Sequence, residues 1–182
     1  MEMKSEIAQS AEMCVIGSIL IDQKTLVNVV DTLKPEHFYF NELKESYKAI
    51  LELSSEGKAI DFISVLKRLT AKGVCSESEA KKLLFNCTEL VPSVREIKGY
   101  ATTVVDGSKA RKLQQIGMKL AFDGVSAENA NEVADEVMGE LYEILSKQHK
   151  KHLQDIDRVG LKVLESYKKA DASLENRSQT GF

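Results

Sequence analysis

The chain lacks the short motifs by which proteins hold nucleotides, metals or covalent intermediates. Its 182 residues contain no Gly-rich loop ending in Lys-Ser or Lys-Thr, no paired metal-ligand spacing and no Ser/His/Asp set in a catalytic pattern. We therefore expect that this segment is not an enzyme and has no catalytic, cofactor-binding or metal-binding residues. The chain has instead a series of helices with clear start and stop signals, a pattern typical of proteins that work by assembling.

Tryptophan is absent, only two prolines occur, and aromatic residues make up 6% of the chain, whereas hydrophobic residues reach 43% and charged residues 29%. This composition favours helices around an aliphatic core over a sandwich or barrel. The net charge of −3 argues against a nucleic-acid binder with a wholly basic surface. Three widely spaced cysteines form neither a disulfide framework nor a zinc pattern. No stretch resembles a signal peptide or approaches a membrane span, so we expect a cytoplasmic protein that does not contact membranes.

Helix punctuation divides residues 1–90 into about five short helices, a compact head. The residues placed as N-caps or as a capping-box pair are Asp22, Asn41, Asp61, and Ser76 with Glu79. Gly57 and Gly73 follow two helix ends, where a left-handed residue is needed. No segment shows sustained strand alternation, so the sequence predicts an all-α fold.

Residues 91–147 predict a long antiparallel helical hairpin that belongs to the same domain. Ser93 and Glu96 have capping-box spacing, and no proline interrupts the chain from there to Phe122. Asn129 opens a second long helix after a turn at residues 123–126. Glycines weaken the first helix, so it can kink near Gly107.

The two arms of the predicted hairpin carry opposite charge. The basic residues of the first arm are Lys109, Arg111, Lys112 and Lys119, and the acidic residues of the second are Glu128, Glu132, Asp135, Glu136, Glu140 and Glu143. A fold-back at Gly124 would put Lys119 near Asn131 and Lys112 near Met138. Exposed ion pairs contribute only about 0.2–1 kcal/mol each, so an apolar seam must stabilise the hairpin while the charges fix its register. Two alternatives stay open: the acidic face is merely solvated, or the basic residues contact DNA phosphates.

Some apolar residues of the hairpin are candidates for packing between the arms or for dimerisation. They are Ile97, Tyr100, Val104, Val137, Leu141 and Ile144. The first arm is hydrophobic on more than one face, so a second copy of the chain can cover the remainder. Ordinary intrachain core is the alternative for each of these residues.

The sequence predicts a separate linker region at residues 148–182. A basic stretch precedes an amphipathic helix at about 155–170 and a mobile C-terminal tail. An isolated helix of this length is marginal in water, so we expect it to dock on another domain or subunit. The candidate docking residues are Ile156, Leu161, Leu164 and Tyr167. His149 and His152 could share a metal, but a solvated basic linker is favoured because no Cys or acid lies nearby.

Two segments near the N-terminus carry a specific pattern. Residues 12–22 read Glu-Met-Cys-Val-Ile-Gly-Ser-Ile-Leu-Ile-Asp, and residues 33–39 read Leu-Lys-Pro-Glu-His-Phe-Tyr. Further segments follow in order and spacing at residues 47–50, 57–61, 91–92 and 100–105. Together they resemble the N-terminal domain and linker helix of DnaB-type replicative DNA helicases. The resemblance covers about residues 8–170.

The resemblance implies a non-catalytic assembly and recruitment domain of a hexameric replicative DNA helicase. In that family the hairpins pair into dimers, three dimers form a collar, and the collar recruits primase and a helicase loader. The linker helix packs on a neighbouring subunit and leads to a RecA-like ATPase, which we expect this chain to lack because it stops at Phe182, about where that ATPase would begin.

The same resemblance implies that ATP and Mg²⁺ are used only by the motor domain, which makes the full-length parent an ATP-dependent DNA helicase. Contact with single-stranded DNA is then weak or indirect. The alternative function belongs to a different class: a stand-alone helical adaptor or loader-like regulatory protein that binds one partner or nucleic acid directly. Self-association favours the first reading, and a monomer with one tight partner favours the second.

Overall fold

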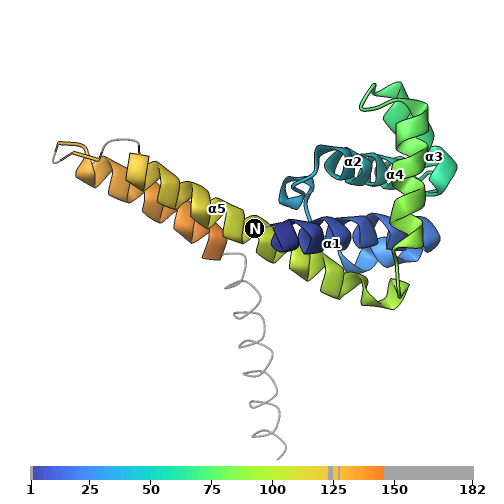
Figure 1. Cartoon of the computed structure of the whole chain (residues 1–182), viewed down its shortest axis with the longest axis horizontal. Coiled ribbons are helices and arrows are strands. Elements are labelled where there is room, and N and C mark those ends of the chain that lie inside the picture. Colours follow the sequence, from blue (N-terminus) through green and yellow to red (C-terminus); the bar gives the residue numbers. More distant parts are fainter. Residues whose placement is uncertain (1, 123–124, 127, 146–182) are drawn as a thin grey trace, which may run out of the picture. The chain divides into compact units, whose positions relative to one another are not determined.

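The computed structural model describes residues 2–122, 125–126 and 128–145. Its elements are α1 (Glu2–Ile21), η1 (Gln23–Asn28), η2 (Pro35–His37), α2 (Asn41–Ser55), α3 (Phe62–Ala71), α4 (Glu77–Glu89), η3 (Val94–Glu96) and α5 (Ile97–Phe122), followed by a helix over residues 130–145 (Figure 1). The described residues contain no strand, and the predicted all-α fold is confirmed. Among these helices, none combines the length and apolar character that a membrane span requires.

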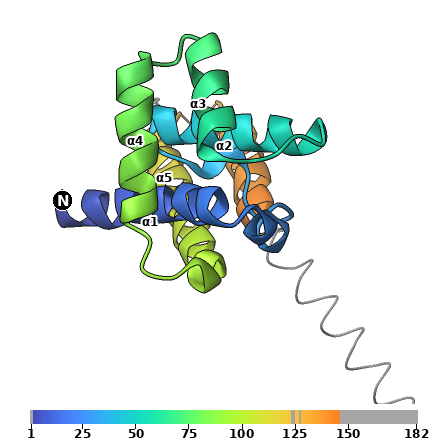
Figure 2. The same cartoon turned by 90° about the vertical axis from the view of Figure 1, so that its right-hand side faces the viewer.

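The chain forms two compact units, Met1–Gln115 and Ile116–Phe182. In the first unit α1 packs against α4, and α3 packs against both α2 and α4 (Figure 2). The first part of α5 belongs to this unit as well, because Ile97, Ala101 and Val104 are buried in its core. The first unit therefore extends beyond the head predicted at residues 1–90.

An aliphatic core with a few aromatic rings holds the first unit together. Ile16 and Ile19 lie on the buried face of α1, and each such side chain stabilises the fold by roughly 1.5–3 kcal/mol. Tyr47 of α2 stacks on Phe38, with ring centroids 5.1 Å apart, and its hydroxyl donates to the Leu33 carbonyl oxygen at 3.2 Å. Burial raises the pKa of Tyr47 to about 12, so this hydroxyl remains a donor.

Three of the predicted N-terminal caps are confirmed. The carboxylates of Asp22 and Asp61 accept backbone N–H groups two and three residues further along the chain, at 3.0 and 2.8 Å. At the start of α4, the Ser76 N–H donates to the Glu79 carboxylate at 2.9 Å and the Glu79 N–H donates to Ser76 Oγ at 3.3 Å. These are the reciprocal bonds of a capping box.

Two glycines end helices as predicted. Gly57 and Gly73 follow α2 and α3 with φ angles of 65° and 64°. Any residue with a Cβ atom would be strained in this left-handed conformation, so glycine is required for the chain to leave both helices in this way.

Four other local expectations are not met. The helix expected after Asp22 is a 3-10 helix of six residues, η1. Asn41 is the first residue of α2 and not its cap; Phe40 takes the cap position and makes no side-chain cap. Ser93 makes no side-chain cap, and a 3-10 turn, η3, precedes α5. Finally, α5 runs unbroken through Gly107, so the possible kink there is not formed.

Candidate functional site

The second unit contains the candidate interaction site, a pair of helices. We call it the hairpin; its first arm is residues 116–122 of α5 and its second arm is residues 130–145. Asn129 directly precedes the second arm, at the helix start that the sequence predicts. Its side-chain Oδ1 accepts the Ser126 N–H at 2.7 Å, and its carbonyl oxygen accepts the Val133 N–H at 3.0 Å.

An apolar seam and an ion pair join the two arms. Ile116 and Val137 are buried, at 6% and 9% exposure. Lys119 Nζ lies 2.7 Å from a carboxylate oxygen of Glu136 and 3.5 Å from one of Glu140. The hydrogen bond that Lys119 donates to Glu136 raises the pKa of Lys119, so the pair stays charged. The prediction that opposite charges face each other across the hairpin is therefore confirmed at Lys119.

The register of this pairing differs from the expected one. Lys119 was predicted to lie near Asn131, but it pairs with Glu136, more than one helical turn further along. The second arm begins only at residue 130, so the connection is longer than a tight turn at Gly124. Lys109 pairs instead with Asp106 of its own helix, at 3.3 Å.

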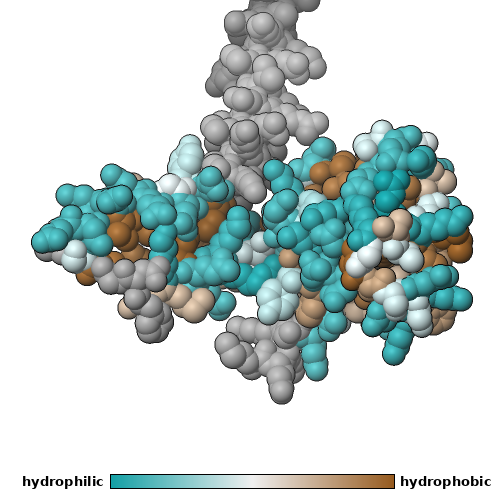
Figure 3. Space-filling view, turned by 90° about the horizontal axis from the view of Figure 1, so that it is seen from above, coloured by the Kyte–Doolittle hydropathy of each residue, from teal (hydrophilic) through white to brown (hydrophobic). Residues whose placement is uncertain are grey.

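The outward face of the second arm is apolar. Met138, Tyr142 and Leu145 are 67%, 73% and 50% exposed, and their spacing of four and three residues puts them on one helix face. A Cβ atom at Gly139 would meet none of the described atoms within 4 Å, so the backbone is open there. Figure 3 shows hydrophobic surface beside hydrophilic surface along the hairpin, at the left of the view.

This apolar face lies within strongly acidic surroundings. Residues 128–145 include six acidic residues and no basic residue. Lys119 of the first arm supplies one positive charge to two of them. The second arm thus keeps a surplus of negative charge beside exposed apolar side chains, which can bind an apolar surface and, more strongly, one that carries basic residues.

The sequence-predicted interface residues lie in different places. Val137 is in the seam, and Leu141 and Ile144 are half-buried on the second arm. Ile97 and Val104 are in the core of the first unit, and Tyr100 is half-buried against that core. Their part in dimerisation stays a prediction. Sequence reasoning missed Met138, Tyr142 and Leu145, although their helical spacing was available as a signal.

Other predicted sites fall outside the described residues. These are the linker-docking residues Ile156, Leu161, Leu164 and Tyr167, and the two histidines His149 and His152. Among the residues that the structure describes, no group of His, Cys, Asp or Glu side chains is arranged to hold a metal ion.

Comparison with known proteins points to one family. Residues 4–106 match the family model of the DnaB-like helicase N-terminal domain. The chain is 27% identical over 176 residues to the replicative DNA helicase DnaB of Leifsonia xyli subsp. xyli (strain CTCB07), covering 94% of this chain and 38% of the relative. It is also 27% identical over 150 residues to DnaB of Geobacillus stearothermophilus, covering 80% and 33%. The chain thus spans about a third of the length of these relatives.

Solved structures agree with the sequence matches. The N-terminal domain of DnaB helicase from Mycobacterium tuberculosis superposes with a TM-score of 0.64 at 25% identity, covering 74% of this chain and 96% of that domain. A DnaB-like replicative helicase, solved in a study of its interactions with primase, superposes with a TM-score of 0.58 at 27% identity, covering 75% and 30%. The matches concern the non-motor part of the helicase, and the chain belongs to the family of DnaB-like helicase N-terminal domains.

Proposed function

We propose that this chain is the non-catalytic assembly and recruitment domain of a hexameric replicative DNA helicase, and that it self-associates through its hairpin. The family match and the names of the relatives support the helicase context. The observation that carries self-association is the exposed apolar face of the second arm, formed by Met138, Tyr142 and Leu145.

The energetics favour pairing of two copies. Burying one such side chain contributes roughly 1.5–3 kcal/mol, and in a two-fold dimer every side chain counts twice. The acidic residues of two copies would repel each other, so salt should leave this association intact or strengthen it.

Recruitment is the second part of the proposal. A DnaB-like helicase of similar fold interacts with primase, which supports primase as a partner of this domain. A helicase loader is a further proposed partner. The surplus negative charge of the second arm suits a partner surface with basic residues, and binding of that kind weakens as salt rises.

The linker region is the third part of the proposal. Its candidate docking residues are proposed to pack on a neighbouring subunit; they are Ile156, Leu161, Leu164 and Tyr167. Contact with single-stranded DNA is proposed to be weak or indirect, and the protein is proposed to act in the cytoplasm.

Light scattering of the 182-residue chain over a concentration series, at low and high salt, tests the self-association. The wild type should form dimers or hexamers at micromolar concentration. Tyr142→Asp should shift it toward the monomer, because each charge buried without a partner weakens the interface. Val27→Asp on η1 is the matched control, since Val27 and Tyr142 are equally exposed at 73%, and it should leave the mass unchanged.

A strict monomer at the highest concentration would contradict self-association by this domain. The hairpin would then serve as a docking arm for a different protein, as in the adaptor alternative. Equal dissociation by Val27→Asp and Tyr142→Asp would show that the contact surface is not confined to the hairpin.

A further inference from the structure

A polar cluster in the first unit joins three segments that are far apart in the sequence. Glu12 of α1 is 1% exposed, and its carboxylate accepts the backbone N–H groups of Tyr39 and Phe40 at 2.7 and 3.2 Å. From α5, Arg111 Nη2 donates to the His37 carbonyl oxygen at 2.6 Å. The guanidinium carbon lies 5.2 Å from the centroid of the Tyr39 ring, within range of a cation–π interaction. We call these five residues the clasp.

The members of the clasp depend on one another. Burial raises the pKa of Glu12, and the N–H groups of Tyr39 and Phe40 and the charge of Arg111 counteract part of that rise. Loss of one partner would leave a buried charge or donor unsatisfied, which costs more than an ordinary hydrogen bond contributes. The clasp therefore forms as a unit.

Arg111 follows a weak turn of α5, which contains Gly107. It lies one helical turn beyond Gly107, and a Cβ atom on that glycine would be 3.5 Å from Arg111 Nη1. A helix interior is less stable with glycine than with alanine, so Gly107 weakens α5 at this turn. Before this turn, Ile97, Ala101 and Val104 fix α5 in the core. After Gly107, the contacts of Arg111 in the clasp hold α5 in place.

We propose that the clasp is a releasable lock on α5: it keeps the helix straight across Gly107 while Arg111 is bound and lets it bend there when Arg111 is free. Tyr39 is 62% exposed, so the aromatic side of the lock is reachable from solvent. The lock is a property of the first unit and does not require self-association.

Amide hydrogen exchange, followed residue by residue at one low concentration of the whole chain, tests the lock. Arg111→Gln should speed exchange of residues 105–112 about tenfold or more, the effect of losing a hydrogen bond from a charged group. Adding Gly107→Ala to that variant should slow the same amides again, because alanine stiffens the weak turn. Glu12→Gln should speed exchange at Tyr39 and Phe40.

The matched control is Arg95→Gln, which changes an exposed arginine of η3 and should leave these rates unchanged. Should Arg111→Gln fail to fold, Arg111→Lys tests the same point, since lysine keeps the charge but loses the planar fork. Unchanged rates at residues 105–112 in the Arg111 variants would overturn the proposal. So would a double variant that exchanges as fast as Arg111→Gln alone.

Discussion

At Gly17, α1 approaches the backbone of α4 too closely for any side chain. A Cβ atom there would lie 2.0 Å from the Cys87 carbonyl oxygen and 2.7 Å from Val91 Cγ2. Cys87 belongs to α4, which packs against α1, and Val91 follows the end of α4; a backbone oxygen cannot rotate out of the way. Gly17 is therefore the residue that permits this helix crossing.

Gly17→Ala should destabilise the domain by about 1–3 kcal/mol or more, because the two helices must move apart. Gly99→Ala in α5 is the control: its nearest contact would be Glu96 Oε2 at 3.9 Å, so alanine fits there and should gain up to about 1 kcal/mol through helix propensity. Urea unfolding of the three chains gives both values. Equal stability of the wild type and Gly17→Ala would contradict the close crossing.

Some contacts of single residues could not be predicted from the sequence. Gly17 was part of the segment that resembles the helicase family, but its structural reason lies 70 residues away at Cys87. Glu12 likewise binds N–H groups 27 and 28 residues further along the chain. Neither contact leaves a local pattern in the sequence, because both depend on how helices meet.

At the scale of elements, three of the caps predicted from signals within one turn are present. The caps at Asp22, Asp61 and Ser76 depend on residues two or three positions away, and all three form. The cap expected at Asn41 does not form, because α2 begins one residue earlier than predicted, with Phe40 in the cap position. A local signal was sufficient at these three helix starts but not at Ser93, where no side-chain cap forms.

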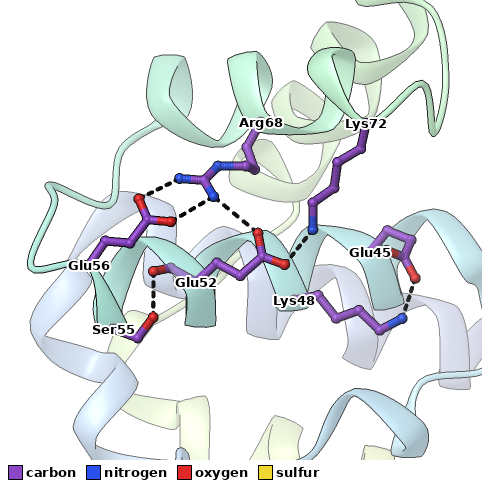
Figure 4. A network of polar contacts seen from close by, with 7 residues as sticks. All are labelled: Glu45, Lys48, Glu52, Ser55, Glu56, Arg68 and Lys72. Atoms are coloured by element: carbon purple, nitrogen blue, oxygen red, sulfur yellow. Dashed lines mark hydrogen bonds and ion pairs between the residues drawn. The ribbon is translucent and has the colours of Figure 1, made fainter.

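A network of ion pairs joins α2 to α3. Arg68 of α3 donates to both oxygens of Glu56, at 2.8 and 2.7 Å, and to Glu52 at 3.2 Å, while Lys72 also binds Glu52 (Figure 4). The hydrogen bonds from Arg68, and then from Lys58, lower the pKa of Glu56 from 4.5 to about 2. A carboxyl with a lowered pKa adds stability that is present above its unfolded pKa and lost as pH falls through its folded pKa.

Glu56→Gln should therefore lower Tm at neutral pH, and the difference from the wild type should shrink as pH falls from 4.5 toward 2. High salt should reduce it as well, because the network is exposed. Glu45→Gln is the control, because it removes only the ion pair with Lys48 within α2. The Tm difference between this variant and the wild type should not show the same dependence on pH. Thermal unfolding over a pH series measures this. A difference that persists unchanged at pH 2 would contradict the assignment.

At the scale of the whole molecule, the all-α class and the hairpin were predictable, because the helical periodicity and the opposite charges of the two arms can be read directly from the sequence. The extent of the first unit could not be predicted, because the burial of Ile97 and Val104 depends on helices that precede them in the chain. The interaction surface was only partly predictable. Helical periodicity identifies the apolar positions of the second arm, but it does not say which of them are buried. The structure shows that Val137 is buried in the seam, whereas Met138 and Tyr142 are exposed.

The central claim is that the hairpin is the surface through which copies of this chain meet. Hydrogen-exchange mass spectrometry of the wild-type chain at low and high concentration tests it most directly. We predict that peptides from residues 116–122 and 130–145 become protected as concentration rises, while peptides from α1 to α4 do not change. Concentration-dependent protection confined to α1–α4, or none in the hairpin while the solution mass increases, would contradict the account.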